Sequence, residues 1–223
     1  MNNLFLPNYI SENAPEGTRF TVGLWLVICA CLVISVAVLG GITRLTHSGL
    51  SMVTWEPLSG ILPPLSQSAW LKEFLNYQQF PEYKLLNKGM SLDGFKSIFW
   101  LEYFHRLLAR VLGLVFALPF LFLLFSRRLE TSFLLKLFGL LILGGMQGVM
   151  GWLMVASGLV ERPDVSHYRL TAHLGLAVLI FISMIWLSLR IIISYKPEGL
   201  SGGIITRKFY FESFLIIPFV FFL

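Results

Sequence analysis

The chain has 223 residues, of which 56% are hydrophobic and only 13% are charged. A soluble domain carries roughly 25% charged residues, so this composition excludes an ordinary soluble protein and indicates a membrane protein. The formal net charge is +5, but the lysines and arginines lie between apolar runs and form no continuous stripe. A nucleic-acid partner is therefore not expected.

A polar segment, residues 1–19, opens the chain and lacks the basic start and small-residue cleavage site of a removable signal peptide. The apolar run that follows, about residues 20–41, is long enough to cross a membrane, which takes roughly 20 mostly apolar residues. It contains both cysteines, Cys29 and Cys31. Because residues two apart point to different sides of a helix, we expect them to stay unpaired and to serve as small apolar side chains.

Residues 43–97, called the long loop below, separate the first predicted helix from the second. The loop is rich in Trp, Tyr and Phe, which suit the boundary between membrane and water. Residues 68–77 are predicted to form a short helix on the membrane surface, and Pro81 is predicted to end it. Two roles remain open for the loop, a lid that only caps the bundle and a surface that contacts substrate.

The second predicted helix, about residues 98–125, opens with Glu102, His105, Arg106 and Arg110. Ionisable groups inside a membrane helix are costly and usually face the bundle interior or a water-filled space. Their spacing of three and four residues places Glu102 on one face with His105 and Arg106, so a Glu–Arg pair would offset part of this cost. The alternative is that these side chains lie at the boundary and extend toward lipid headgroups.

The third predicted helix, about residues 133–155, contains Gly144 and Gly148 at GxxxG spacing. Small residues at this spacing allow membrane helices to approach closely, so the pair predicts packing and no chemistry. Gln147, in the same run, is expected to form a hydrogen bond between helices.

The fourth predicted helix, about residues 168–193, carries His173, with Arg169 one turn earlier on the same face. His105 lies about seven residues into the second helix and His173 about five into the fourth, so at 1.5 Å per residue their depths differ by only about 3 Å. Imidazole is a standard haem ligand, and bundle cores hold such cofactors. The histidine pair therefore predicts two axial ligands of one haem iron.

Four arginines near the two histidines are candidate partners for the haem propionates, because guanidinium groups bind carboxylates well. They are Arg44, Arg106, Arg110 and Arg169. Zinc is less favoured, since no thiolate or cluster of carboxylates completes four ligands. His47 and His167 lie in predicted loops, and we expect them to be solvated or hydrogen-bonded.

The last apolar run, residues 209–223, spans about 15 residues and is too short to cross a membrane unaided. The sequence thus predicts an all-α, polytopic membrane four-helix bundle over residues 20–195, followed by a loop and an incomplete fifth helix in residues 196–223. Basic residues after the second and fourth helices indicate that these loops, and with them the N-terminus, face the cytoplasm, while the long loop faces outward.

Several linked motifs resemble the haem A synthase family, in its mitochondrial and alphaproteobacterial branch. They are GGITRLTHSGLSM (40–52), WEPLSGILPPLS (55–66), FPEYK (80–84), FWLEYFHRLLARVLGLVFALPF (99–120), GGMQGVMGWLMVASGL (144–159) and YRLTAHLGLA (168–177). The resemblance covers about residues 18–195.

The resemblance implies an enzyme with eight membrane helices in two similar halves, each with a histidine pair. His105 and His173 match the pair of the first half, which is expected to bind the substrate haem O as axial ligands. The second half, expected to hold a haem b cofactor, has no counterpart in this chain, so either the chain is a fragment or another chain completes it. The family's ExxHR motif matches Glu102, His105 and Arg106, and its glutamate is expected to be catalytic.

The implied reaction is an oxidation of the C8 methyl of haem O to a formyl group, with water as the expected oxygen source. The product, haem A, serves cytochrome c oxidase. We expect the chain to lie in a bacterial inner membrane, and a mitochondrial inner membrane is the less favoured alternative. Expected partners are membrane lipid, haem O synthase, cytochrome oxidase assembly factors and a second copy of the chain.

Two rival interpretations remain. The first is a bis-histidine b-type haem protein that only carries electrons in the membrane, which the histidine positions fit equally well. The second is a structural or assembly subunit without a cofactor, whose histidines could be replaced freely.

Overall fold

The computed structural model describes residues 9–12, 14–54, 59–160 and 163–193. Four long helices dominate it: α1 (Thr18–Leu45), α4 (Leu92–Ser126), α5 (Thr131–Gly158) and α6 (His167–Ile193). All four are long and apolar enough to cross a membrane, which confirms the predicted all-α membrane fold. The predicted fifth helix, within residues 196–223, lies outside the described residues.

Three short helices occupy the long loop, which the extended ends of α1 and α4 reduce to residues 46–91. They are η1 (Ser59–Ile61), α2 (Gln67–Tyr77) and α3 (Pro81–Leu85). The predicted short helix is confirmed as α2, and the side chain of Ser66 caps it by accepting a hydrogen bond from the Ala69 N–H at 3.2 Å. The prediction that Pro81 ends this helix is wrong. Proline needs no N–H partner in a first helical turn, and Pro81 begins α3.

The chain forms two compact units, and each long helix contributes to both. One unit contains residues up to Cys31, Phe116–Ile142 and the chain from Val178. Its core includes the buried residues Leu26, Phe133 and Leu137. The ring of Tyr9 lies 5.0 Å from that of Phe133, so the segment before α1 packs on the start of α5.

The cysteines fulfil their prediction. Cys29 is buried and Cys31 is exposed, and both are free thiols. Because the two side chains point to different sides of α1, no disulfide connects them, and Cys29 serves as a small core residue.

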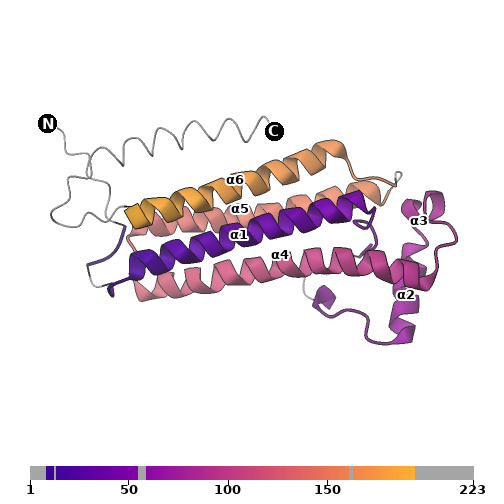
Figure 1. The fold of residues 1–223 in the computed structure, drawn as a ribbon, viewed down its shortest axis with the longest axis horizontal. Helices are drawn as coiled ribbons and strands as arrows, with labels where there is room; N and C mark the ends of the chain where they lie inside the picture. The colour runs from indigo at the N-terminus through magenta and orange to yellow at the C-terminus, as the bar shows by residue number, and fades with distance from the viewer. Residues whose placement is uncertain (1–8, 13, 55–58, 161–162, 194–223) are drawn as a thin grey trace. The chain divides into compact units, whose positions relative to one another are not determined.

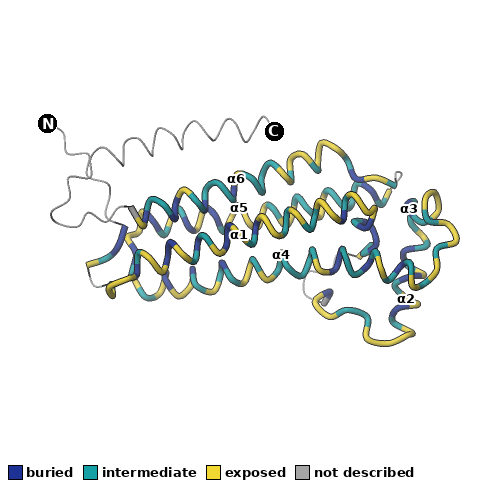
Figure 2. The backbone as a smooth tube through the Cα atoms, in the orientation of Figure 1, coloured by how far each residue is buried: buried dark blue, intermediate teal, exposed yellow. Residues whose placement is uncertain are grey.

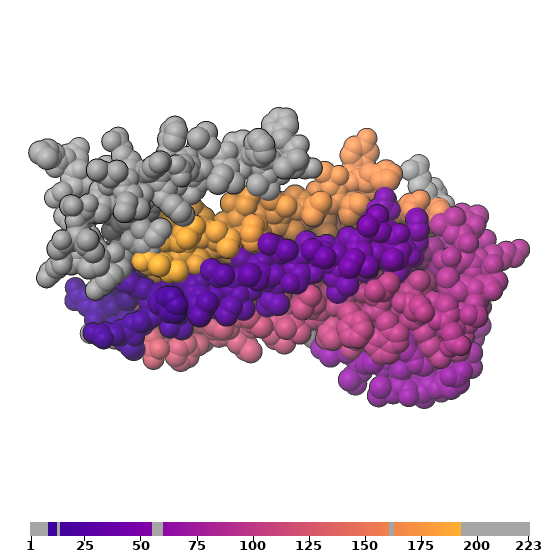
Figure 3. Space-filling view, viewed as in Figure 1, coloured from indigo at the N-terminus to yellow at the C-terminus, as the bar shows by residue number. Residues whose placement is uncertain are grey.

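The other unit, Leu32–Val115 with Leu143–Ala177, contains the long loop and every candidate site residue. Aromatic side chains from α2 and the first turns of α4 form a core of this unit, and the ribbon shows α2 and α3 beside the start of α4 (Figure 1). The cluster consists of Trp70, Phe74, Tyr77, Phe95, Phe99 and Tyr103. In the space-filling view the long loop and the start of α4 form one continuous surface (Figure 3), and the aromatic contacts make the loop a packed part of this unit.

This aromatic core also explains where α4 begins. The helix starts at Leu92, about two turns before the predicted start near residue 98. The Ser91 side chain accepts a hydrogen bond from the Gly94 N–H at 3.2 Å, which caps the new end. Phe95 is fully buried, so burial of its ring stabilises turns that are too polar to be recognised as a membrane span.

The prediction of close helix packing at Gly144 and Gly148 is wrong for the described chain. Both glycines are exposed, and a Cβ added at either would meet nothing within 4 Å. Close approaches on α5 lie at Gly151, where the neighbour is the imidazole of His173, and at Gly158, where it is the side chain of Leu50.

Candidate functional site

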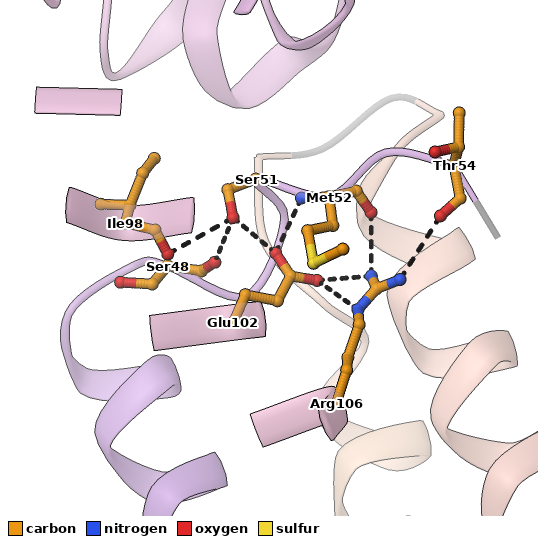
Figure 4. Close-up of polar contacts among 7 residues, drawn as sticks. All are labelled: Ser48, Ser51, Met52, Thr54, Ile98, Glu102 and Arg106. Carbon is orange, nitrogen blue, oxygen red and sulfur yellow. Dashed lines mark hydrogen bonds and ion pairs between the residues drawn. The ribbon is translucent and has the colours of Figure 1, made fainter. Parts of the chain in front are cut away.

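Glu102 lies on α4 with 2% of its surface exposed, and its carboxylate accepts hydrogen bonds on both oxygens (Figure 4). Oε2 accepts from the Ser51 hydroxyl at 2.7 Å and from the Met52 N–H at 2.8 Å. Oε1 accepts from Nε of Arg106 at 3.0 Å and also from its Nη2. Since a carboxylate offers about four lone-pair sites and every partner here is a donor, this is the geometry of an ionised carboxylate.

Arg106 extends the same network to the backbone of the long loop. Its Nη2 donates to the Met52 carbonyl at 2.8 Å and its Nη1 to the Thr54 carbonyl at 3.4 Å (Figure 4). We call Glu102, Arg106, Ser51 and Met52 the loop anchor, because together they fasten residues 51–54 to α4. Ser48 and Ser51 are accordingly buried, and the chain just after α1 includes buried, dark blue backbone in Figure 2.

His105 lies three residues after Glu102 on α4, and its ring packs against α1. A Cβ added to Gly40 of α1 would lie 3.0 Å from Nε2 of His105. Within the described part of the chain, neither ring nitrogen of His105 has a hydrogen-bond partner. The imidazole is therefore held by packing, and its nitrogens are not committed to another side chain.

His173 lies on α6 and packs against α5. A Cβ added to Gly151 would lie 3.0 Å from Cε1 of the imidazole. Gln147, one turn before Gly151 on the same face of α5, donates from Nε2 to the His173 carbonyl at 3.1 Å. The predicted interhelical hydrogen bond of Gln147 is thus confirmed.

The two histidines fit the haem that the sequence predicts. His105 and His173 belong to the same unit. Nδ1 of His173 and Oε1 of Gln147 are buried without a hydrogen-bond partner among the described residues. Buried polar atoms normally have partners, so these suit a group bound between the helices. Two imidazoles from facing helices are a suitable ligand pair for a haem.

The other predicted arginines belong to the same unit as the histidines and have different surroundings. Arg44 forms an ion pair of 3.7 Å with Asp164, and Nη1 of Arg169 donates to the Leu153 carbonyl at 2.6 Å. Arg110 is half-buried on α4, one turn beyond Arg106. His47 and His167 are exposed, as predicted, although His167 begins α6 rather than lying in the loop before it.

A second buried carboxyl group, which the sequence does not reveal, lies in the long loop. Glu82 is 2% exposed, and its Oε2 accepts a hydrogen bond from the Tyr77 hydroxyl at 3.1 Å. Asn87 donates to the same hydroxyl at 2.7 Å. Burial raises the pKa of Glu82 to about 7, the negative charges of Glu102 and Asp164 add to the rise, and the Tyr77 hydrogen bond opposes it.

We predict that the loop is more stable in mild acid. The pKa of Glu82 is raised from 4.5 to about 7 on folding, so the folded state binds more protons between these values. The contribution of protonated Glu82 to the free energy of unfolding is complete below about pH 4.5 and is lost as the pH rises through about 7. The whole contribution is roughly 3 kcal/mol. Limited proteolysis of the loop at pH 5 and pH 8 measures it, and Glu82→Gln should abolish the difference. Equal cleavage of the parent chain at both values would contradict the prediction.

The chain matches one family model and several curated relatives. The model of the family described as cytochrome oxidase assembly protein matches residues 23–220. Over 182 residues the chain is 54% identical to a protein of Nitrosospira multiformis named "Heme A synthase", covering 82% of this chain and 51% of the relative. It is 47% identical over 197 residues to a protein of the same name from Parvibaculum lavamentivorans, covering 88% and 57%.

A third protein with this name, from Agrobacterium fabrum, is 50% identical over 184 residues, which are 82% of this chain and 50% of the relative. The chain thus spans about half the length of the curated relatives it matches. No solved structure is significantly similar to it. On the strength of the family match and these relatives, the chain belongs to the cytochrome oxidase assembly protein family that includes the haem A synthases.

Proposed function

We propose that this chain forms the haem O-binding part of a haem A synthase, with His105 and His173 as the axial ligands. The observation that carries the proposal is the histidine pair itself: one histidine comes from α4 and the other from α6 of the same unit, and Nδ1 of His173 is buried without a hydrogen-bond partner among the described residues. Bound there, the macrocycle would be held in an apolar bundle core. The names of the relatives supply the reaction class.

The arginines divide into two roles under this proposal. Arg106 is already occupied by Glu102 and two loop carbonyls, so it acts chiefly by holding the loop, and any propionate contact uses its remaining capacity. Arg44, Arg110 and Arg169 bring positive charge to the same unit and are the candidate propionate partners, because guanidinium–carboxylate pairs are strong and directional.

The reaction converts a methyl group and water into a formyl group, releasing four protons and four electrons. In the full-length enzyme the electrons would pass to a haem b in the second half, as the family resemblance implies. Glu102 is the proposed catalytic residue, three positions from His105. The four hydrogen bonds that its carboxylate accepts favour a fixed negative charge that stabilises positive charge developing on the substrate, rather than a role as the proton acceptor.

The setting follows from the same proposal. We propose a bacterial inner membrane as its location, with the N-terminus in the cytoplasm and the long loop outside, and the four apolar helices support a membrane setting. Haem O synthase would supply the substrate and cytochrome oxidase assembly would consume the product. A b-type electron carrier is the alternative, and it predicts a different pigment.

The identity of the bound haem tests the proposal. The chain is produced together with a haem O synthase, purified, and its haem is extracted and identified by mass and by pyridine-haemochrome spectrum. We expect the farnesylated haem O in roughly equal amount to protein, since two histidine ligands define one site. Haem b alone would favour the electron carrier, and a colourless protein would exclude a haem-binding role for this chain.

A further inference from the structure

We propose that Gly40 of α1 and Gly151 of α5 are positioning residues that set the orientation of the two haem ligands. The proposal rests on the haem-binding function above and extends it to residues that bear no functional group. Among the described glycines, these two alone have an imidazole within 4 Å of the position a Cβ would take. Nε2 is the atom of His105 nearest the Gly40 position, and Cε1 is the atom of His173 nearest the Gly151 position, so each proposed ligand has a glycine of a neighbouring helix against the nitrogen-bearing edge of its ring.

The distances are short enough to matter. An added Cβ would lie 3.0 Å from Nε2 of His105 at Gly40, and 3.0 Å from Cε1 of His173 at Gly151. Ordinary contact between non-bonded carbon atoms is about 3.5–4.0 Å. A methyl group would therefore push each ring away from the neighbouring helix. An imidazole that ligates iron has little freedom to yield, because its side chain occupies staggered wells and its nitrogen must point at the metal.

His173 shows how tightly the ring is enclosed. Gln147 lies on the same face of α5 as Gly151, one turn earlier, and its Nε2 is 3.5 Å from Nε2 of His173 and 3.1 Å from the His173 carbonyl. The ring cannot turn toward Gln147 to avoid a methyl at Gly151. For this reason we expect the alanine at position 151 to displace the iron-binding nitrogen of the ring, because the side chain cannot rotate away from the added methyl group.

The chain offers a matched control for each position. Gly41, next to Gly40 on α1, and Gly145 on α5 are exposed and have nothing within 4 Å of their Cβ positions. Replacing glycine with alanine inside a helix favours helix formation by up to about 1 kcal/mol at all four sites. A loss confined to Gly40→Ala and Gly151→Ala therefore cannot come from weaker helices.

The test uses the full chain produced with a haem O synthase, with the parent and the variants G40A, G151A, G41A and G145A. The readouts are haem-to-protein ratio, apparent affinity for added haem, and the electron paramagnetic resonance spectrum of the ferric form. Displacing a group that orients a metal ligand weakens binding about 10- to 100-fold. We expect at least about tenfold weaker binding and a new high-spin signal in G40A and G151A, and parent-like values in G41A and G145A.

Three results would overturn the inference. Parent-like haem binding and a low-spin spectrum in both G40A and G151A would refute it while leaving the proposed function intact. If haem-free G40A and G151A lose helix content while G41A and G145A keep the helix content of the parent, the two glycines serve general packing and do not specifically position the ligands. A parent chain that binds no haem would remove the proposed function and this inference together.

Discussion

Replacing Glu102 with alanine is expected to detach residues 51–54 from α4 and to destabilise the unit that contains the histidines. The change removes the partner of a largely buried guanidinium, since the side chains of Arg106 and Glu102 are 18% and 3% exposed. Breaking such a pair by removing one partner costs roughly 3–5 kcal/mol. The Ser51 hydroxyl and the Met52 N–H also lose their acceptor. The unfolding midpoint and protease cleavage in the long loop measure the effect.

Asp93→Ala is the matched control, because it removes a carboxylate from the same helix. The Asp93 side chain is 91% exposed and pairs with Lys96 at 3.2 Å. Exposed ion pairs contribute only about 0–1 kcal/mol, so this variant should resemble the parent. If Glu102 has only a chemical role, Glu102→Ala should lose turnover but keep the parent's loop cleavage, stability and haem content. That result would contradict the role of Glu102 in the loop anchor.

A double-mutant cycle separates the ion pair from the other contacts. Glu102→Ala and Arg106→Ala should each be severe, because each leaves one buried charge without its partner. The double variant should lose clearly less free energy of unfolding than the sum of the losses in the two single variants. The difference, which is the coupling energy, should be about 2 kcal/mol or more. Additive effects would mean that the pair does not hold the loop.

The long apolar runs made the fold predictable, because four membrane helices can be recognised from length and composition. The loop end of α4 was not predictable from hydropathy. Residues 92–97 are too polar for a membrane span and become helical through the Ser91 cap and the buried ring of Phe95. The role of Pro81 was also misjudged, because a proline can begin a helix as readily as it can end one.

Part of the site followed from spacing. Glu102 and Arg106 are four apart on a helix, so their pairing was expected, and the similar depths of His105 and His173 agree with their place in one unit. Ser51 and Met52 were missed because they lie about fifty residues from Glu102 in the chain, and a backbone N–H leaves no trace in the sequence.

The glycines and the second buried carboxyl group were missed for a related reason. Gly40 is followed by Gly41 and Gly151 belongs to a glycine-rich run, so nothing in the sequence distinguishes the glycine that touches a histidine from its neighbours. Glu82 looks like one of several charged residues of the loop, and only tertiary packing places it beside Tyr77 at 2% exposure.

Replacing either His105 or His173 with alanine is expected to have the largest effect on haem binding. Each variant removes one of two proposed axial ligands, and the remaining imidazole would hold the iron from one side only. The residual haem should be weakly bound and high-spin. His47→Ala and His167→Ala are the controls, because both side chains are exposed and lie outside the proposed site.

The measurement that tests the account most directly is the haem-to-protein ratio and ferric spectrum of these four variants and the parent, all purified after production with a haem O synthase. The account predicts a low-spin haem in the parent, His47→Ala and His167→Ala, and its loss from both His105→Ala and His173→Ala. A parent-like, low-spin haem in either His105→Ala or His173→Ala would contradict the claim that these two residues hold one iron between α4 and α6.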